Sequence, residues 1–190
     1  TLKAEKRSMD VKAKKLRREG FVTGNLFGRE IEGSIPLKFT KKEIEVLLKN
    51  NNKGSQVMLE LDGKTYDALI KEVDYNPLAH TVEEVDFQAL VSNEMVHSTA
   101  EIILENEEKV MSGVLQDELK EVAYKALPAD LVDKIKVDVA GMKIGDTLRV
   151  KDLEIAKNKN IHITTDPEAV VATVTPVHNV VPETETEAEE

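Results

Sequence analysis

Cysteine is absent from this chain of 190 residues. Without it the chain forms no disulfide, offers no thiolate nucleophile and binds no zinc through sulfur, which fits a reducing compartment. No apolar run approaches the roughly 18 residues that a membrane span needs, and no hydrophobic signal core follows the basic N-terminal residues. We therefore expect a soluble, cytoplasmic protein.

Residues for catalysis or metal binding are equally scarce. The four histidines are spread along the chain without the spacing of metal ligands. Acidic neighbours such as Glu83 and Glu84 would point apart on a strand, and no serine lies in a G-x-S-x-G context. The sequence predicts no enzyme, no metal site and no cofactor.

Positive charge accumulates in one place. Residues 1–20 hold eight basic and three acidic side chains, a net charge of +5, although the whole chain carries −10. The other 170 residues therefore carry −15 and form no general surface for polyanions. A concentrated basic patch attracts phosphates by Coulomb steering and counterion release. The alternative is a solvated, partly flexible N-terminal arm without a ligand.

The next 70 residues are predicted to form strands connected by short turns, with one helix between them. Glycines punctuate residues 20–33, and alternating apolar residues predict a strand over 31–39. Thr40 and Glu43 form a capping box that begins a helix ending near Lys49. Asp62-Gly63 predicts a type I′ hairpin, with Leu59 opposite Tyr66. A turn at Asn76-Pro77 precedes a last strand, so we expect a small closed or half-closed barrel.

A second domain is expected from residue 92 to residue 181. Its segments alternate mostly as strands, whereas residues 115–125 suit a helix or a strand. Residues 182–190 contain five glutamates and no basic residue, so they should form a disordered acidic tail. The predicted fold class is mainly β with short helices, as a barrel domain over 1–91 and a mainly β domain over 92–181.

Several motifs resemble one known family. Residues 12–28, KAKKLRREGFVTGNLFG, are similar to its basic pair, leucine and arginine before a segment that ends in Tyr-Gly. Residues 70–87 resemble its Lys-x-Val-Gln, proline-centred turn and His-Val-Asp-Phe. ALPADLVDKIKVDVAGMKIGDTLRVKDL is similar to its C-terminal domain. The family is the bacterial 5S rRNA-binding ribosomal proteins of the general stress protein Ctc type, the two-domain form of large-subunit protein twenty-five.

The resemblance implies an N-terminal six-stranded barrel that binds 5S rRNA in the central protuberance of the large subunit. It also implies a mainly β domain that contacts neighbouring ribosomal components, with no catalysis and no membrane, in a chain that is monomeric off the ribosome. The RNA-binding residues that follow from the motifs are Arg7, Lys12, Lys14, Lys15, Arg17, Arg18, Phe27 and Asp86.

Three positions depart from the family pattern. Phe27 replaces a tyrosine and loses its hydroxyl, Asp74 replaces a glutamine, and Glu84 replaces a histidine. The two carboxylates accept hydrogen bonds but donate none, and they repel nearby phosphates. These departures leave open a second class of function, a stress-related paralogue with weakened RNA affinity that acts as a protein-interaction module. The distribution of charge on the folded surface discriminates between the two. The interaction module is favoured if Asp74, Glu84 and Asp86 line the same face as Arg17 and Arg18 with no cation between them.

Overall fold

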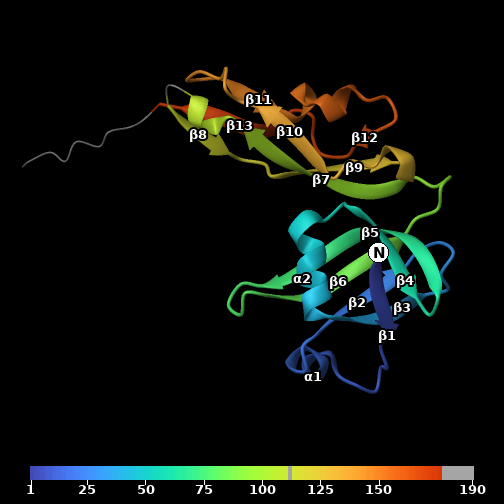
Figure 1. The fold of residues 1–190 in the computed structure, drawn as a ribbon. Coiled ribbons are helices and arrows are strands. Elements are labelled where there is room, and N and C mark those ends of the chain that lie inside the picture. Colours follow the sequence, from blue (N-terminus) through green and yellow to red (C-terminus); the bar gives the residue numbers. More distant parts are fainter. Residues whose placement is uncertain (111–112, 177–190) are drawn as a thin grey trace, which may run out of the picture.

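The computed structural model describes residues 1–110 and 113–176, which form two β domains stacked end to end (Figure 1). The predicted acidic tail lies outside the described residues. In the part of the chain that the structure describes, no helix combines the length and apolar character needed to cross a bilayer.

The first domain is a closed six-stranded barrel with the strand order β1-β3-β2-β6-β5-β4. β1 closes it by pairing antiparallel with β3 and parallel with β4. This confirms the predicted mainly β fold with an N-terminal six-stranded barrel. Its elements are β1 (Leu2–Lys6), α1 (Ala13–Arg18), β2 (Phe21–Phe27), β3 (Ser34–Thr40), α2 (Lys41–Asn50), β4 (Gln56–Leu61), β5 (Lys64–Asn76) and β6 (Thr81–Ala89).

Two local signals set the connections of the barrel as predicted. The Thr40 side chain accepts from the backbone of Glu43, whose carboxylate accepts from the Thr40 backbone, so the capping box starts α2. Asp62 and Gly63 both have positive φ, 49° and 77°, and join β4 to β5 in a tight hairpin. Leu59 lies opposite Tyr66 in that hairpin, in the predicted register.

Aromatic and aliphatic side chains fill the barrel. Phe39 and Phe87 lie with their ring centroids 5.4 Å apart, and Leu26, Leu37 and Leu59 are fully buried. β2 and β6 pair in parallel next to this core. The outward residues of these two strands therefore lie side by side on the outer face of the barrel, here called its outer wall.

The second domain packs two sheets, ordered β10-β7-β9-β12 and β11-β13-β8. Within residues 115–125, which suited a helix or a strand, residues 115–117 pair with β13 and residues 121–125 pair with β7, both as strands, and residues 118–120 connect them. The elements are β7 (Val96–Glu105), β8 (Val114–Asp117), β9 (Glu121–Ala126), β10 (Lys134–Asp138), β11 (Thr147–Arg149), β12 (His162–Ile163) and β13 (Val170–Thr175), with 3₁₀ helices η1 (Glu107–Lys109), η2 (Pro128–Asp130), η3 (Val150–Asp152) and η4 (Glu154–Lys157).

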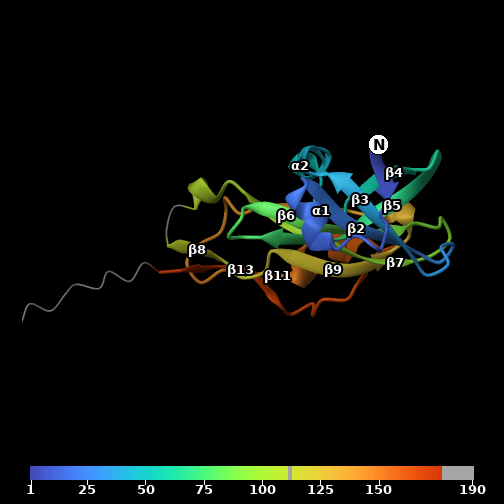
Figure 2. The ribbon, with the colours of Figure 1, turned by 90° about the horizontal axis from the view of Figure 1, so that it is seen from below.

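The basic N-terminal residues are part of the barrel rather than a flexible arm. Leu2 and Ala4 of β1 are buried in the core, and Leu16 of α1 is 7% exposed. The apolar residues that alternate with the lysines drive this packing, which the count of charges alone did not reveal. α1 lies outside the barrel against β2, as the two perpendicular views show (Figures 1 and 2).

Polar contacts join the two domains beside the linker. Ser55 Oγ donates to Asp133 Oδ2 at 3.1 Å, Lys71 Nζ donates to the His97 carbonyl at 2.7 Å, and the Asn52 amide contacts the Glu101 carboxylate. Gly54 lies between them at a φ of +89°, and a Cβ atom there would stand 1.9 Å from the Thr99 carbonyl oxygen. The close approach of the domains therefore depends on a residue without a side chain.

Replacing Gly54 with alanine should loosen the contact between the domains while both cores stay folded. The added methyl group collides with the β7 backbone, and the domains must separate to accommodate it. Small-angle scattering should show a larger radius of gyration. Gly63→Ala is the matched control, because its φ is also positive but nothing lies within 4 Å of its added Cβ. An equal change in the radius of gyration of both variants would mean that backbone strain alone causes the effect.

Candidate nucleic-acid interface

The short helix α1 presents the basic residues of the candidate site. It begins after Lys12, which caps it without a side-chain hydrogen bond, and it ends before Gly20, whose φ is +88°. Basic side chains in the last turn complement the partial negative charge at a helix C-terminus. Leu16 is buried and anchors the helix, so the remaining side chains of α1 are directed away from the barrel core.

The structure separates the predicted phosphate-binding residues into two groups. Lys12, Lys14 and Arg18 are exposed and have no carboxylate within 4 Å among the described residues. Two others are engaged within the protein. Lys15 Nζ lies 3.8 Å from Glu19, and the half-buried Arg7 donates through Nη2 to the Val11 carbonyl at 3.2 Å. Lys12 at the N-cap of α1, and Lys14 and Arg18 within α1, are thus cations without a carboxylate partner in the part of the chain that the structure describes.

Lys6 also lies in the basic stretch but has a partner. Its Nζ is 2.7 Å from Asp62 Oδ2 in the β4–β5 hairpin. The hydrogen bond and the charge of Asp62 raise the pKa of Lys6 above its ordinary value. The ammonium therefore stays charged at neutral pH, and part of its field is offset locally by Asp62.

Arg17 holds α1 against β6. Its Nη1 donates to Glu83 Oε2 at 2.9 Å, its Nη2 donates to Glu84 Oε2 at 3.3 Å, and its Nε donates to the Glu83 carbonyl at 3.2 Å. The Arg17 side chain is 29% exposed. A guanidinium with three such contacts fixes the helix in place and neutralises part of the negative charge beside it.

The outer wall of the barrel next to α1 carries the remaining predicted site residues. Phe27, the last residue of β2, is half-buried and lies beside Gln88 of β6. Asp86 faces outward on β6, and its Oδ1 accepts from both the backbone and the side-chain nitrogen of Asn25, at 2.9 and 3.1 Å. Aromatic and acceptor groups therefore lie on one wall of the barrel, and Arg17 of α1 reaches that wall at Glu83 and Glu84.

The two carboxylates that depart from the family pattern lie on this wall as well. Asp74 of β5 is directly opposite Glu84 of β6, and Glu72 is directly opposite Asp86. These four residues line a shallow hollow. Like charges directly opposite each other repel, so the wall needs compensating donors. Arg17 supplies a cation at Glu84.

Asn25 and Glu72 were not predicted as site residues. The expectation that Glu83 and Glu84 point apart was wrong, because both carboxylates contact Arg17. The outward alternation along β2 places Asn25 between Thr23 and Phe27, and that signal was present in the sequence. The contact of Arg17 with Glu83 joins residues that are 66 positions apart, so no local sequence pattern predicts it. In residues 1–110 and 113–176, no three His, Asp or Glu side chains are placed to hold a metal ion.

The fold and this wall define a two-domain β protein whose barrel carries free cations beside a polar sheet face. The model of the Ribosomal L25p family matches residues 2–87, and that of the C-terminal domain of ribosomal protein TL5 matches residues 95–178. The chain belongs to the bL25 family of bacterial large-subunit ribosomal proteins. The family consists of ribosomal proteins that are not known to be enzymes, which agrees with the prediction of no catalysis.

Curated relatives match along most of the chain. Large ribosomal subunit protein bL25 of Carboxydothermus hydrogenoformans is 32% identical over 190 residues, covering 95% of this chain and 94% of the relative. The bL25 of Bacillus velezensis is 31% identical, covering 93% and 88%. The bL25 of Thermoanaerobacter sp. strain X514 is 29% identical, covering 85% and 81%. The similarity extends over both domains, as the resemblance in the sequence implied.

Proposed function

We propose that this protein binds 5S rRNA in the central protuberance of the large ribosomal subunit, through α1 and the outer wall of β2, β6 and β5. The observation that carries the proposal is the group of three exposed cations, Lys12, Lys14 and Arg18, which have no carboxylate partner among the described residues. Their helix is fastened by Arg17 to the barrel wall that carries an aromatic ring and hydrogen-bond acceptors. Phosphates meet the cations, whereas bases and 2′-hydroxyls of a wide A-form minor groove meet the wall.

The relatives support the ribosomal setting of this proposal. They are large ribosomal subunit proteins, and this chain matches them over nearly their whole length. On the ribosome the protein works in the cytoplasm, with neighbouring large-subunit components as partners of its second domain, and off the ribosome it is a monomer. It holds RNA in place by shape and charge and catalyses no reaction.

The protein-interaction alternative requires a wall that repels RNA. Asp74, Glu84 and Asp86 would provide that repulsion if they had no compensating charge. Arg17 lies 3.3 Å from Glu84 and offsets part of the negative charge, and the uncharged amide of Asn25 donates a hydrogen bond to Asp86. This arrangement favours RNA binding over the alternative.

A titration of the full chain against 5S rRNA should show saturable binding that survives an excess of tRNA. Residues 1–91 should fold alone and retain all of this affinity, whereas residues 93–190 should show none, because the second segment and tail are net negative. A gel-shift assay with each piece measures this. Binding of 5S rRNA and tRNA with equal affinity, or binding by residues 93–190, would contradict the proposal.

A further inference from the structure

Asn25 occupies an unusual position on the wall, between two carboxylates. It is half-buried at an outward position of β2, and its Nδ2 donates to Asp86 Oδ1 at 3.1 Å and to Glu84 Oε1 at 3.4 Å. Its backbone N–H donates to the same Asp86 oxygen at 2.9 Å. The amide nitrogen must face these carboxylates, because the amide oxygen in its place would repel both.

These contacts form one connected row of side chains. Arg17 Nη2 donates to Glu84 Oε2, the other Glu84 oxygen accepts from Asn25, and Asn25 holds Asp86 Oδ1. Both oxygens of Glu84 are thereby occupied within the protein. Asp86 Oδ2 has no hydrogen-bond partner among the described residues, so one acceptor of the row is left for a ligand.

We propose that Asn25 is a positioning residue of the RNA interface, which together with Arg17 aims Asp86 Oδ2 at the exocyclic amino group of a base. A carboxylate repels a phosphate because both are negatively charged, but it accepts hydrogen bonds from base amino groups. In the minor groove the exposed amino group is N2 of guanine. The wall therefore reads a guanine, while α1 holds the backbone. This inference rests on the proposed function.

Two like charges that face each other across neighbouring strands explain why a positioning residue is needed. Glu72 lies directly opposite Asp86, and the backbone N–H of Asn25 alone would hold Asp86 Oδ1 at a single point. Without the additional bond from the Asn25 side chain, the repulsion from Glu72 would rotate the Asp86 carboxylate and turn Oδ2 away from the base. The same argument gives Glu84 a role. It does not repel RNA as an isolated charge, since it links Arg17 to Asn25.

Inosine interference on 5S rRNA tests the inference, because inosine lacks only the 2-amino group of guanosine. With the wild-type protein, inosine at one or a few guanosines should weaken binding. Asn25→Ala should bind 5S rRNA about tenfold more weakly. It should also lose the inosine interference, while the dependence of its affinity on salt stays that of the wild type. The exposed Asn93→Ala is the control and should match the wild type in all three measurements.

Asn25→Leu repeats the test with a side chain of the same branching and number of heavy atoms, so a loss of folding in the alanine variant does not decide the result. Unchanged affinity together with unchanged inosine interference in either folded variant would overturn the inference. So would wild-type binding that is indifferent to inosine. Absence of any 5S rRNA binding by the wild type would instead overturn the proposed function, and the two failures are therefore distinct.

Discussion

Replacing Lys12, Lys14 and Arg18 together with glutamine should weaken 5S rRNA binding by about a hundredfold or more at roughly 0.1 M salt. Each phosphate contact contributes roughly 0.7 to 0.9 to the log–log slope of affinity against salt, so three lost contacts remove about 2 to 3 units. The slope of binding isotherms between about 50 and 300 mM salt measures this. Thermal stability should change little, because these side chains are exposed and lack carboxylate partners among the described residues.

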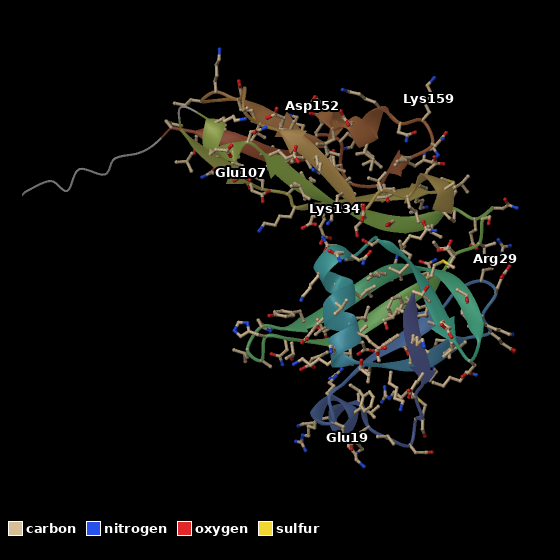
Figure 3. The ribbon with its side chains drawn as sticks, in the orientation of Figure 1. Glu19, Arg29, Glu107, Lys134, Asp152 and Lys159 are labelled. Carbon is tan, nitrogen blue, oxygen red and sulfur yellow. The ribbon has the colours of Figure 1, made fainter. Side chains whose placement is uncertain are left out.

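A control must change the net charge equally without touching α1. Lys143, Lys157 and Lys159 are exposed on the second domain, and Figure 3 shows Lys159 at the opposite end of the molecule from Glu19 beside α1. Their replacement with glutamine should leave the salt slope within a few tenths of the wild-type value. If both triple variants flatten the slope alike, binding depends on the overall charge and not on α1.

Arg17 is left out of the triple variant because its charge is already used within the protein. Its guanidinium is bound by Glu83 and Glu84, and it holds α1 on the barrel. Substituting it would change the position of the helix as well as the charge, so the measured slope would mix two effects. A direct contact of Arg17 with RNA stays a prediction.

Gly24→Ala should destabilise the barrel by about 3 kcal/mol, near the upper end of the cost of overpacking a core. The added Cβ would stand 2.0 Å from the Val85 carbonyl oxygen and 3.3 Å from the Phe39 ring. The oxygen belongs to the β6 backbone, so relief requires β2 and β6 to move apart. For a domain of this size we expect the melting temperature to fall by roughly 10 to 20 °C.

Calorimetry of the full chain measures this effect, and Gly141→Ala provides the comparison. Gly141 is exposed in the second domain, and nothing lies within 4 Å of an added Cβ there. That variant should melt within about 2 °C of the wild type, as surface substitutions usually do. A Gly24→Ala protein as stable as Gly141→Ala would mean that β2 and β6 lie farther apart in solution.

Local patterns in the sequence predicted the elements whose geometry is set by neighbouring residues. The Thr40–Glu43 capping box and the Asp62-Gly63 hairpin each depend on a few consecutive positions, and both form as expected. In contrast, residues 115–125 suited either a helix or a strand. Their periodicity was ambiguous, and pairing with distant strands decided it.

The charge count likewise located the basic stretch, but only the tertiary structure decided which of its cations are free. Arg17 and Arg18 are adjacent and chemically identical. Arg17 nevertheless pairs with two glutamates that lie 66 and 67 positions later in the sequence, whereas Arg18 pairs with no carboxylate among the described residues. Asn25 gains its position in the same way, since Glu84 and Asp86 lie about 60 residues away. Ion pairs and hydrogen bonds at such separation follow from strand order and register, which composition and local spacing do not encode.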